Sequence, residues 1–553
     1  MSALARKLAR PEILSLPSAA ALVGGADEYR QDVVRLHLNE NGQAPLVQGY
    51  DAAALNRYPE PQAPALRRTM ADLYGVGPEN LVITRGADDA IDILIRSFCR
   101  SGLDAIATIV PSFSAYSLFA RIQGADIVEL PLGPDFALDG NALIATVEDQ
   151  PAIKLAFLCS PNNPTGNVVP PAEVLRIADA LRDTILVLDE AYIEFAEVES
   201  LSAEAIRRDN LVVLRTLSKA WGLAGARVGC AIANAGLIDI IARTLPPFPL
   251  SSASISAAQA ILAPSRRLVH AERLARLKAE RTRMAGLLAD MPMVKRVWPS
   301  EANFLLIEAT DIDRVRKRLG ERGIRVRFRP DIAPGALRLT IGSDEENALA
   351  LGAFGLDGAP ASPRRGEAVR DTKETRIAAA IDLDRASPRR IETGIPFFDH
   401  MLDQVAAHGG FSLVLGCEGD LEIDAHHSLE DVAITFGQAL AGALGERRGI
   451  GRFGFALPMD EAEANVLIDL SGRPFAKFEG AFRASHIGAY PTAMTPHIFR
   501  SIADSLGAAI HVQVSGEDDH HKTEACFKAF GRALRQAIAV EKGAGVPSTK
   551  GVL

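Results

Sequence analysis

A duplicated motif in the last third of the chain constrains the fold more than any other feature. HHSLE at 426–430 recurs as HHKTE at 520–524, and each copy is followed at the same spacing by Phe-Gly and then Ala-Leu. One further histidine lies upstream of each copy, His400 before the first and His497 before the second. The repeat predicts a domain built from two similar halves. Each half supplies three imidazoles and one carboxylate, which gives two candidate metal sites.

The spacing within the motif limits how its side chains can share a metal. On a helix, residues four apart lie on one face, so His426 and Glu430 can meet the same ion. Adjacent histidines diverge by about 100° around a helix, which predicts that His426 and His427 face different metals. One such histidine alone is as well explained as an ordinary polar group of the fold, but two matching sets favour metal binding. The expected ligands are His400, His426, His427, Glu430, His497, His520, His521 and Glu524.

Length and composition set the broad class of protein. A chain of 553 residues is expected to form two or three domains. The net charge of −9 argues against a nucleic-acid partner, which usually requires a basic patch. The five cysteines include no CxxC pair, which predicts reduced thiols. The basic start lacks a following apolar segment and no long apolar run occurs, so we expect a cytoplasmic protein without a secretory signal or membrane span.

Between about 33 and 213, short apolar runs alternate with segments of helical periodicity. This alternation predicts βα units and a mostly parallel sheet. Helical periodicity over 256–288 leads into a smaller α/β domain that ends near 354. The stretch 355–368 is rich in Gly, Pro, Ser and charge, which predicts a linker. After the linker, a new strand is expected over 375–384. The apolar runs of the first domain, mentioned above, lie at 81–83, 106–110, 155–158, 185–188 and 211–214.

Polar residues follow three of these strands. SPNNPTG at 160–166 contains Asn163, DEAY at 189–192 begins with Asp189, and Lys219 follows the strand at 211–214. Taken singly, these are a turn residue, a cap and a solvated lysine. Because ligands of open α/β sheets bind at the carboxyl ends of the strands, the ordered set predicts a ligand site there.

The first 355 residues carry further motifs, and residues 8–355 resemble the fold-type I, pyridoxal-phosphate-dependent aminotransferases, among them the histidinol-phosphate aminotransferases. This implies a large domain with a mostly parallel sheet and a small α/β domain. The stretches that carry the resemblance are RYPEP at 57–61, RGAD at 85–88, SPNNPTG at 160–166, DEAYIEF at 189–195, RTLSKA at 215–220, GARVG at 225–229 and LRLTIG at 337–342.

The resemblance implies how pyridoxal phosphate is bound. Lys219 would hold it as a Schiff base and move a proton, while Asp189 would keep the pyridine nitrogen protonated. Tyr192 and Asn163 would hydrogen-bond its phenolic oxygen, and Phe113 would stack on the ring unless it is only a core aromatic. The residues expected at its phosphate, partly through amides at a helix N-terminus, are Ala87, Asp88, Ser218 and Arg227, with Tyr58 reaching a phosphate across a dimer interface.

The substrate residues implied by the resemblance are two arginines. Arg338 would bind the substrate carboxylate through both arms of its guanidinium. Arg327 would meet the substrate phosphate, or else is a solvated charge. A Pro-Tyr that the family often has near the N-terminus is absent from SLPSA at 15–19, although Tyr29 lies later. This departure leaves a broad aromatic aminotransferase open as the alternative function.

The duplicated domain resembles the imidazoleglycerol-phosphate dehydratases over 368–553, and an α+β fold of duplicated halves is implied. The resemblance implies two divalent metals, with manganese expected, and a role for Glu374 as an acid–base group or substrate contact. The residues expected at the substrate phosphate are Arg452, Arg473, Ser548 and Lys550. Matching stretches are KET at 373–375, TGIPFFDHML at 393–402, DAHH at 424–427, RFG at 452–454, PMDE at 458–461, SGRP at 471–474, the second HHxxE and STKG at 548–551.

Together the two resemblances imply consecutive steps of histidine biosynthesis. The dehydratase would convert imidazole glycerol phosphate to imidazole acetol phosphate, and the aminotransferase would convert that ketone, with glutamate, to histidinol phosphate. A regulator that senses the cofactor is disfavoured, because no basic DNA-binding segment is seen. A homo-oligomer of aminotransferase dimers, with a large dehydratase-type assembly, is expected. The predicted domains are 1–355 (large domain about 30–250, small domain about 256–355 with an N-terminal arm), the linker 356–368, and 369–553.

Overall fold

The computed structural model describes residues 33–41, 43, 57–356, 363–456, 460–541 and 547. By its contacts the chain forms two compact units, each described here by itself. Unit 1 comprises Met1–Pro45, Gly49–Gln259 and Leu274–Pro360, and unit 2 comprises Leu46–Gln48, Ala260–Arg273 and Ala361–Leu553. Among the helices of the described ranges, none combines the length and the apolar character needed to cross a membrane.

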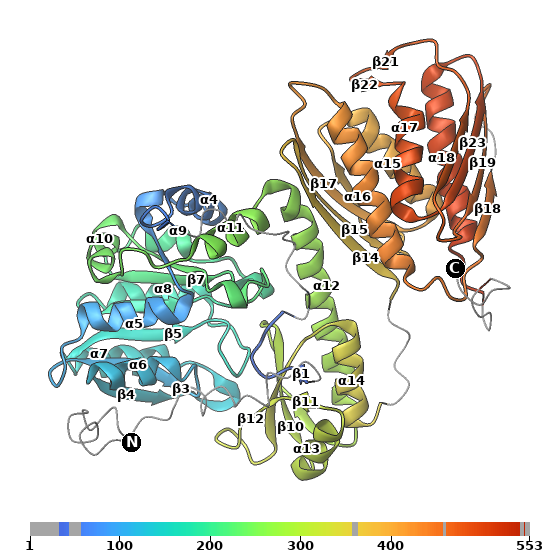
Figure 1. Cartoon of the computed structure of the whole chain (residues 1–553). Helices are drawn as coiled ribbons and strands as arrows, with labels where there is room; N and C mark the ends of the chain where they lie inside the picture. The colour runs from blue at the N-terminus through green and yellow to red at the C-terminus, as the bar shows by residue number, and fades with distance from the viewer. Residues whose placement is uncertain are drawn as a thin grey trace. The chain divides into compact units, whose positions relative to one another are not determined.

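Unit 1 contains a seven-stranded sheet in the order β2-β8-β7-β6-β5-β3-β4 (Figure 1). Every neighbouring pair is parallel except those made by β8, which runs antiparallel to β2 and β7. The predicted mostly parallel sheet is therefore confirmed. Its strands are β2 (Leu81–Thr84), β3 (Ala105–Val110), β4 (Asp126–Pro131), β5 (Ile153–Cys159), β6 (Ile185–Asp189), β7 (Leu211–Thr216) and β8 (Gly229–Ile232).

Helices follow the strands of this sheet, as βα units require. Apart from the edge strand β4, which has no buried residue, the strands between them are almost fully buried, which explains why they appear in the sequence as continuous apolar runs rather than alternating ones. The helices are α4 (Pro64–Tyr74), α5 (Ala87–Phe98), α6 (Ala115–Gln123), α7 (Gly140–Glu148), α8 (Pro171–Ala180), α9 (Ser202–Ala205) and α10 (Ala235–Thr244).

The smaller part of unit 1 is an antiparallel sheet in the order β12-β13-β10-β9. A separate two-stranded sheet is formed by β1 (Val34–Arg35), which pairs in parallel with β11 (Ile324–Arg325). The helical stretch predicted over 256–288 is divided into two helices, and Pro264 begins the second. The remaining elements are β9 (Val294–Val297), β10 (Phe304–Ala309), β12 (Arg327–Phe328), β13 (Ala336–Thr340), α11 (Ser252–Ile261), α12 (Pro264–Ala289), α13 (Ile312–Glu321) and α14 (Asp344–Phe354). Of these, the end of α11 from Ala260 and the start of α12 up to Arg273 belong to unit 2.

Unit 2 consists of two four-stranded sheets with the same topology. The orders are β14-β15-β17-β16 and β18-β19-β23-β20, and in each sheet two antiparallel pairs are followed by one parallel pair. The duplicated halves predicted from the motif are thus confirmed. The strands are β14 (Arg365–Asp371), β15 (Thr375–Asp382), β16 (Arg389–Glu392), β17 (Ser412–Gly419), β18 (Phe453–Ala456), β19 (Glu463–Asp469), β20 (Phe475–Glu479) and β23 (Ala509–Ser515), with a small hairpin of β21 (His486–Ile487) and β22 (Tyr490–Pro491).

Four helices lie between these two sheets (Figure 1). Each half contributes two of them, and the helices pack across the halves, α16 with α17 and α15 with α18. Their apolar faces and the inward residues of the strands form one buried core. The helices are α15 (Pro396–Gly409), α16 (His426–Leu444), α17 (Met494–Leu506) and α18 (Asp519–Ala537).

Candidate functional site

Lys219 lies three residues beyond β7 in a partly buried position of unit 1. Its Nζ donates a hydrogen bond of 3.0 Å to the Leu38 carbonyl and lies 5.9 Å from the centre of the Tyr192 ring. Burial, reinforced by the positive charge of Arg338, lowers the pKa of Lys219 to about 8. A lysine with such a pKa has an appreciable neutral, nucleophilic fraction near neutral pH.

Asp189 is the last residue of β6 and is buried. Its carboxylate accepts hydrogen bonds from the Tyr116 hydroxyl at 2.8 Å and from the Ala191 amide at 3.1 Å. Burial raises the pKa of Asp189 to about 6, and these two hydrogen bonds oppose the rise. The carboxylate is therefore mostly ionised at pH 7, as a partner for a pyridinium nitrogen must be.

Three predicted residues, Tyr192, Asn163 and Arg338, are linked through the side chain of Asn163. The Tyr192 hydroxyl oxygen accepts hydrogen bonds from Nδ2 of Asn163 at 3.4 Å and from Nδ2 of Asn39 at 2.9 Å. Arg338 bonds through one arm to Oδ1 of Asn163 and through the other to the His37 carbonyl. The structure thus brings Asn163, Tyr192 and Arg338 together, although they are separated by up to 175 residues.

The N-terminus of α5 has the features of a phosphate site. Gly86 precedes the helix with φ of 82°, and no side chain of the described residues caps this end. The Arg227 guanidinium lies beside it, 3.3 Å from the Ser218 hydroxyl and 3.3 Å from the Asp88 carboxylate. The positive φ of Gly86 favours glycine, and a Cβ atom at this position would lie 2.7 Å from Nη2 of Arg227, so another residue would displace the guanidinium. Free amides beside a guanidinium and a hydroxyl fit a bound phosphate.

Three other predicted residues of unit 1, Phe113, Tyr58 and Arg327, make contacts outside the groups described so far. Phe113 packs edge-on against Tyr116 with ring centres 5.7 Å apart. Tyr58 is 80% exposed and stacks on Phe248. Arg327 is exposed and pairs in register with Arg338 on the neighbouring strand. Residues 15–19 and Tyr29 lie outside the described residues.

The first histidine cluster of unit 2 consists of His426, Glu430 and His497, whose ligand atoms all lie within 4.8 Å of one another. Nε2 of His426 is 3.6 Å from one carboxylate oxygen of Glu430, and Nε2 of His497 is 3.1 Å from the other. Nε2 of His497 is buried and makes no hydrogen bond within the ranges that the structure describes. An imidazole nitrogen in this state, facing a carboxylate and a second imidazole, fits a transition metal.

A second cluster contains the same residue types in a looser arrangement, in which the ligand atoms do not all lie within 4.8 Å of one another and Nε2 of His400 also lies 3.3 Å from Nε2 of Gln404. Nε2 of His520 is 3.6 Å from one carboxylate oxygen of Glu524, and Nε2 of His400 is 3.7 Å from the other. One difference is that Lys528 also contacts the Glu524 carboxylate, at 2.7 Å.

Each cluster is built across the two halves rather than within one. The motif on α16 of the first half takes its third member, His497, from α17 of the second half. The motif on α18 of the second half takes His400 from α15 of the first half. The crossing follows from the helix packing, because α16 packs on α17 and α15 on α18.

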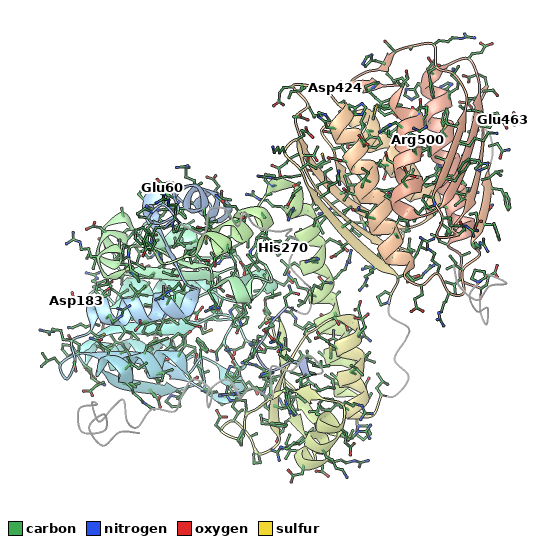
Figure 2. The ribbon with its side chains drawn as sticks, in the orientation of Figure 1. Glu60, Asp183, His270, Asp424, Glu463 and Arg500 are labelled. Carbon is green, nitrogen blue, oxygen red and sulfur yellow. The ribbon has the colours of Figure 1, made fainter. Side chains whose placement is uncertain are left out.

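The second histidine of each motif faces away from its cluster. Nδ1 of His427 lies 3.2 Å from the Asp420 carboxylate, and Nδ1 of His521 lies 2.8 Å from the Glu461 carboxylate. A carboxylate at Nδ1 orients an imidazole so that Nε2 is available to a metal. Asp424, labelled in Figure 2, accepts from the His426 amide at 2.8 Å at the start of α16.

The predicted phosphate and acid–base residues of unit 2 are spread over its loops. Glu374 is exposed in the turn between β14 and β15, near enough that its charge contributes, after the Asp420 hydrogen bond, to the raised pKa of His427. Arg452 pairs with Asp469 and donates to the Pro547 carbonyl at 2.7 Å. Arg473 is exposed after β19. Ser548 and Lys550 lie outside the described residues.

Four residues near these clusters had not been singled out as site residues. Tyr116 and Asn39 hydrogen-bond Asp189 and Tyr192, and Asp420 and Glu461 pair with the outer histidines. Glu461 belongs to PMDE, one of the motifs that carry the resemblance, so the sequence held a signal for it. The contacts of the other three join distant segments, for which no local pattern exists.

Comparison with known proteins finds two family matches, one in each part of the chain. Residues 25–354, more than half of the chain, match the family of class I and II aminotransferases. The chain therefore belongs to this family. Residues 393–534 match the imidazoleglycerol-phosphate dehydratase family. The fused organisation expected from the sequence, with an aminotransferase followed by a dehydratase domain, is confirmed.

Individual proteins that the chain is similar to match either the aminotransferase part or the dehydratase part. The chain is similar to the histidinol-phosphate aminotransferase of Sinorhizobium meliloti in complex with pyridoxal 5′-phosphate (27% identity, TM-score 0.56, 63% of this chain and 96% of that chain). It is similar to the aspartate aminotransferase of Thermus thermophilus (25% identity, TM-score 0.55, 63% of this chain and 98% of that chain). Over the dehydratase part, it is 55% identical to the histidine biosynthesis bifunctional protein HisB of Stenotrophomonas maltophilia across 192 residues, 35% of this chain and 54% of that relative. The chain thus spans about half the length of this curated relative.

Proposed function

We propose that this chain catalyses two consecutive reactions of histidine biosynthesis. Unit 2 would remove water from imidazole glycerol phosphate to give imidazole acetol phosphate. Unit 1 would transfer the amino group of glutamate to that ketone, which gives histidinol phosphate and 2-oxoglutarate. Two features within the regions that match these families carry the proposal. The first is the Lys219 cluster, which we define as Lys219, Asp189, Tyr192, Asn163 and Arg338. The second is the compact group of His426, Glu430 and His497, together with the looser set of His400, His520 and Glu524.

In the aminotransferase reaction, we assign a role to each residue of the cluster. Pyridoxal phosphate, when bound, supplies an electron sink for the bonds broken at the substrate carbon. The Lys219 amine would move the proton from that carbon, and Asp189 would hold the proton on the ring nitrogen. Arg338 would exchange its bonds to Asn163 and His37 for the substrate carboxylate. The phosphate group would lie at the N-terminus of α5, against Arg227 and Ser218.

In the dehydratase reaction, two divalent ions, with manganese our first candidate, would polarise the imidazole and the leaving hydroxyl. His426, Glu430 and His497 would hold one ion, and His400, His520 and Glu524 the other. His427 and His521, whose Nδ1 atoms bond to Asp420 and Glu461 outside these clusters, would complete the metal sites of a neighbouring copy. This would require an assembly of several chains, and we propose a large one. Glu374 would move a proton. The residues proposed at the substrate phosphate are Arg452, Arg473, Ser548 and Lys550.

The proposal includes a division of the chain at about residues 356–368, with aminotransferase dimers formed by the part before it. A coupled turnover assay tests both proposed reactions together. Purified protein with pyridoxal phosphate and Mn²⁺ would receive imidazole glycerol phosphate and glutamate, and histidinol phosphate would be measured. Product that requires both Lys219 and His426 supports the proposal. Build-up of imidazole acetol phosphate without product, together with turnover of phenylalanine, would instead favour a broad aromatic aminotransferase.

Uptake of the cofactor should depend on pH through Lys219. Because only the neutral amine attacks an aldehyde, and the pKa of Lys219 is about 8, the rate should rise with pH and level off above about 8. An ordinary lysine would keep gaining up to about 10.4. The measurement is the growth of visible absorbance after pyridoxal phosphate is added to cofactor-free protein between pH 6 and 10, with Lys219→Ala as the blank. A rate that still climbs between pH 9 and 10 contradicts this prediction.

Glu461 should influence metal binding without being a ligand. Its carboxylate lies 2.8 Å from Nδ1 of His521, and Glu461→Gln would weaken this orienting interaction while keeping the size of the side chain. Loss of such a partner typically lowers metal affinity about 10- to 100-fold. Titration of metal-free protein with Mn²⁺, followed by calorimetry, would measure the change. Glu463→Gln on β19 is the matched control, since Glu463 is exposed; an affinity equal in the two variants argues against the role of Glu461.

A further inference from the structure

We infer that Asn39 is a positioning residue of the aminotransferase site, which directs the hydroxyl hydrogen of Tyr192 toward the cofactor. The inference deepens the proposed function and rests on it. Its starting point is the 2.9 Å hydrogen bond from Nδ2 of Asn39 to the Tyr192 oxygen. Both side chains are buried, Asn39 at 1% and Tyr192 at 4% exposure.

The amide of Asn39 is held in one orientation. Its Oδ1 accepts from the Thr340 hydroxyl at 3.1 Å, and that hydroxyl in turn accepts from the Asn39 backbone amide at 3.1 Å. Because the Thr340 oxygen accepts from the backbone N–H, its own hydrogen is available to Oδ1, which assigns Nδ2 to the Tyr192 side. The Asn39 carbonyl accepts from Nδ2 of Asn303 at 3.1 Å. The backbone and the side chain of Asn39 are therefore both fixed.

Two amide donors occupy the acceptor positions of the Tyr192 oxygen. Besides Asn39, Nδ2 of Asn163 donates to it at 3.4 Å. A phenol oxygen accepts two hydrogen bonds and donates one, so its hydrogen must point to a third group. In the proposed site that group is the phenolic oxygen of pyridoxal phosphate. Burial raises the pKa of Tyr192, while the charge of Arg338 and the Asn39 hydrogen bond act in the opposite direction, as expected when donors face the oxygen.

Asn39 also connects Tyr192 to the strands that carry the substrate residue. Thr340 lies on β13, two residues beyond Arg338, and Asn303 immediately precedes β10. Phe304 of β10 packs edge-on against the Tyr192 ring, with ring centres 5.3 Å apart. Through Asn39, the strands that position Arg338 therefore also position the Tyr192 hydroxyl.

The test uses two substitutions of Asn39 that can adopt its backbone conformation. Asn39 has φ of 54°, which Gly and Asp tolerate better than most residues, so Asn39→Gly and Asn39→Asp avoid added strain. Asn39→Gly removes the donor, and Asn39→Asp replaces it with an acceptor that competes for the Tyr192 hydrogen. Thr340→Ser keeps the hydroxyl that holds the Asn39 side chain, so this variant should behave like the unsubstituted protein. Asn141→Asp on the exposed side of α7 is the matched control.

The primary readout is the pH midpoint of the visible absorbance of the loaded protein. A hydrogen bond donated to the phenolic oxygen stabilises its anionic form and makes the nitrogen joined to Lys219 less basic. Weakening that bond should raise the midpoint by about one pH unit in Asn39→Asp, less in Asn39→Gly, and not at all in Asn141→Asp. The kcat of transamination should fall about tenfold, while KM for glutamate changes less.

A double-substitution cycle with Tyr192→Phe decides the mechanism. If Asn39 acts through the Tyr192 hydroxyl, Asn39→Asp should shift the midpoint no further in a Tyr192→Phe background. Additive shifts, or an unchanged midpoint in both single Asn39 variants, would overturn the inference. A protein that develops no Lys219-dependent visible absorbance would instead reject the proposed function itself, so the two failures can be told apart.

Discussion

Replacing Lys219 by alanine should abolish transamination and leave dehydration unchanged. Lys219 is the only group in the proposed site that would both join the cofactor covalently and move the substrate proton, so we expect kcat to fall by at least about 10⁴-fold. The dehydratase residues belong to the other compact unit. The measurement is imidazole acetol phosphate and histidinol phosphate in the same coupled assay. The ketone should accumulate at the unsubstituted rate while histidinol phosphate disappears.

Lys317→Ala supplies the control for this result. Lys317 lies on α13 of the same unit, and its side chain is 79% exposed, so this substitution removes a lysine without touching the cluster. Both products should then form at the unsubstituted rates. Residual transamination above about 0.01% in Lys219→Ala, beyond the 10⁴-fold fall expected, would show that another group performs the proton transfer, and the assignment of Lys219 would be wrong.

The parts of the fold that the sequence predicts are those determined by residues close together in the chain. The strand at 185–188 is predicted from four consecutive apolar residues and appears as β6, buried and ended by Asp189. The motif at 426–430 predicts a helix that carries His426 and Glu430 on one face, and α16 begins at His426 with the two side chains 3.6 Å apart. In both cases the periodicity of the strand or helix alone decides where the side chains lie.

The parts that escaped prediction depend on contacts between distant segments. The partner of Glu430 in its cluster is His497 of the other half, because α16 packs on α17, and no spacing within the motif encodes that packing. Asn39 meets Tyr192 through such contacts: β1 pairs with β11 in the Val34–Ile324 register, 290 residues apart, and Asn39 itself bonds to Thr340 and Asn303. Tyr116 would read as an ordinary core aromatic until its hydroxyl is seen on Asp189.

Because each histidine cluster takes residues from both halves of unit 2, replacing a single histidine in one half should affect the metal site of the other. His497→Ala should remove one of the two metal ions bound per chain and lower dehydration by more than about 100-fold, because a direct ligand contributes at least as much as the groups that orient it. Transamination should persist. Metal content after dialysis, measured by elemental analysis, and turnover of each substrate would show this. His486→Ala, which removes an exposed histidine on β21, should retain both ions.

Double substitutions then identify the partner of His497. Since His497 lies 3.1 Å from Glu430, adding Glu430→Gln to His497→Ala should cost no further metal, because both changes affect the same site. Adding Glu524→Gln should remove the second ion, because Glu524 belongs with His400 and His520. If each half held its own ion, His497 would share a site with Glu524 and the two double variants would exchange their behaviour. The metal content of these two proteins therefore distinguishes a dehydratase unit whose sites are built across its halves from one that simply contains two separate copies of a site.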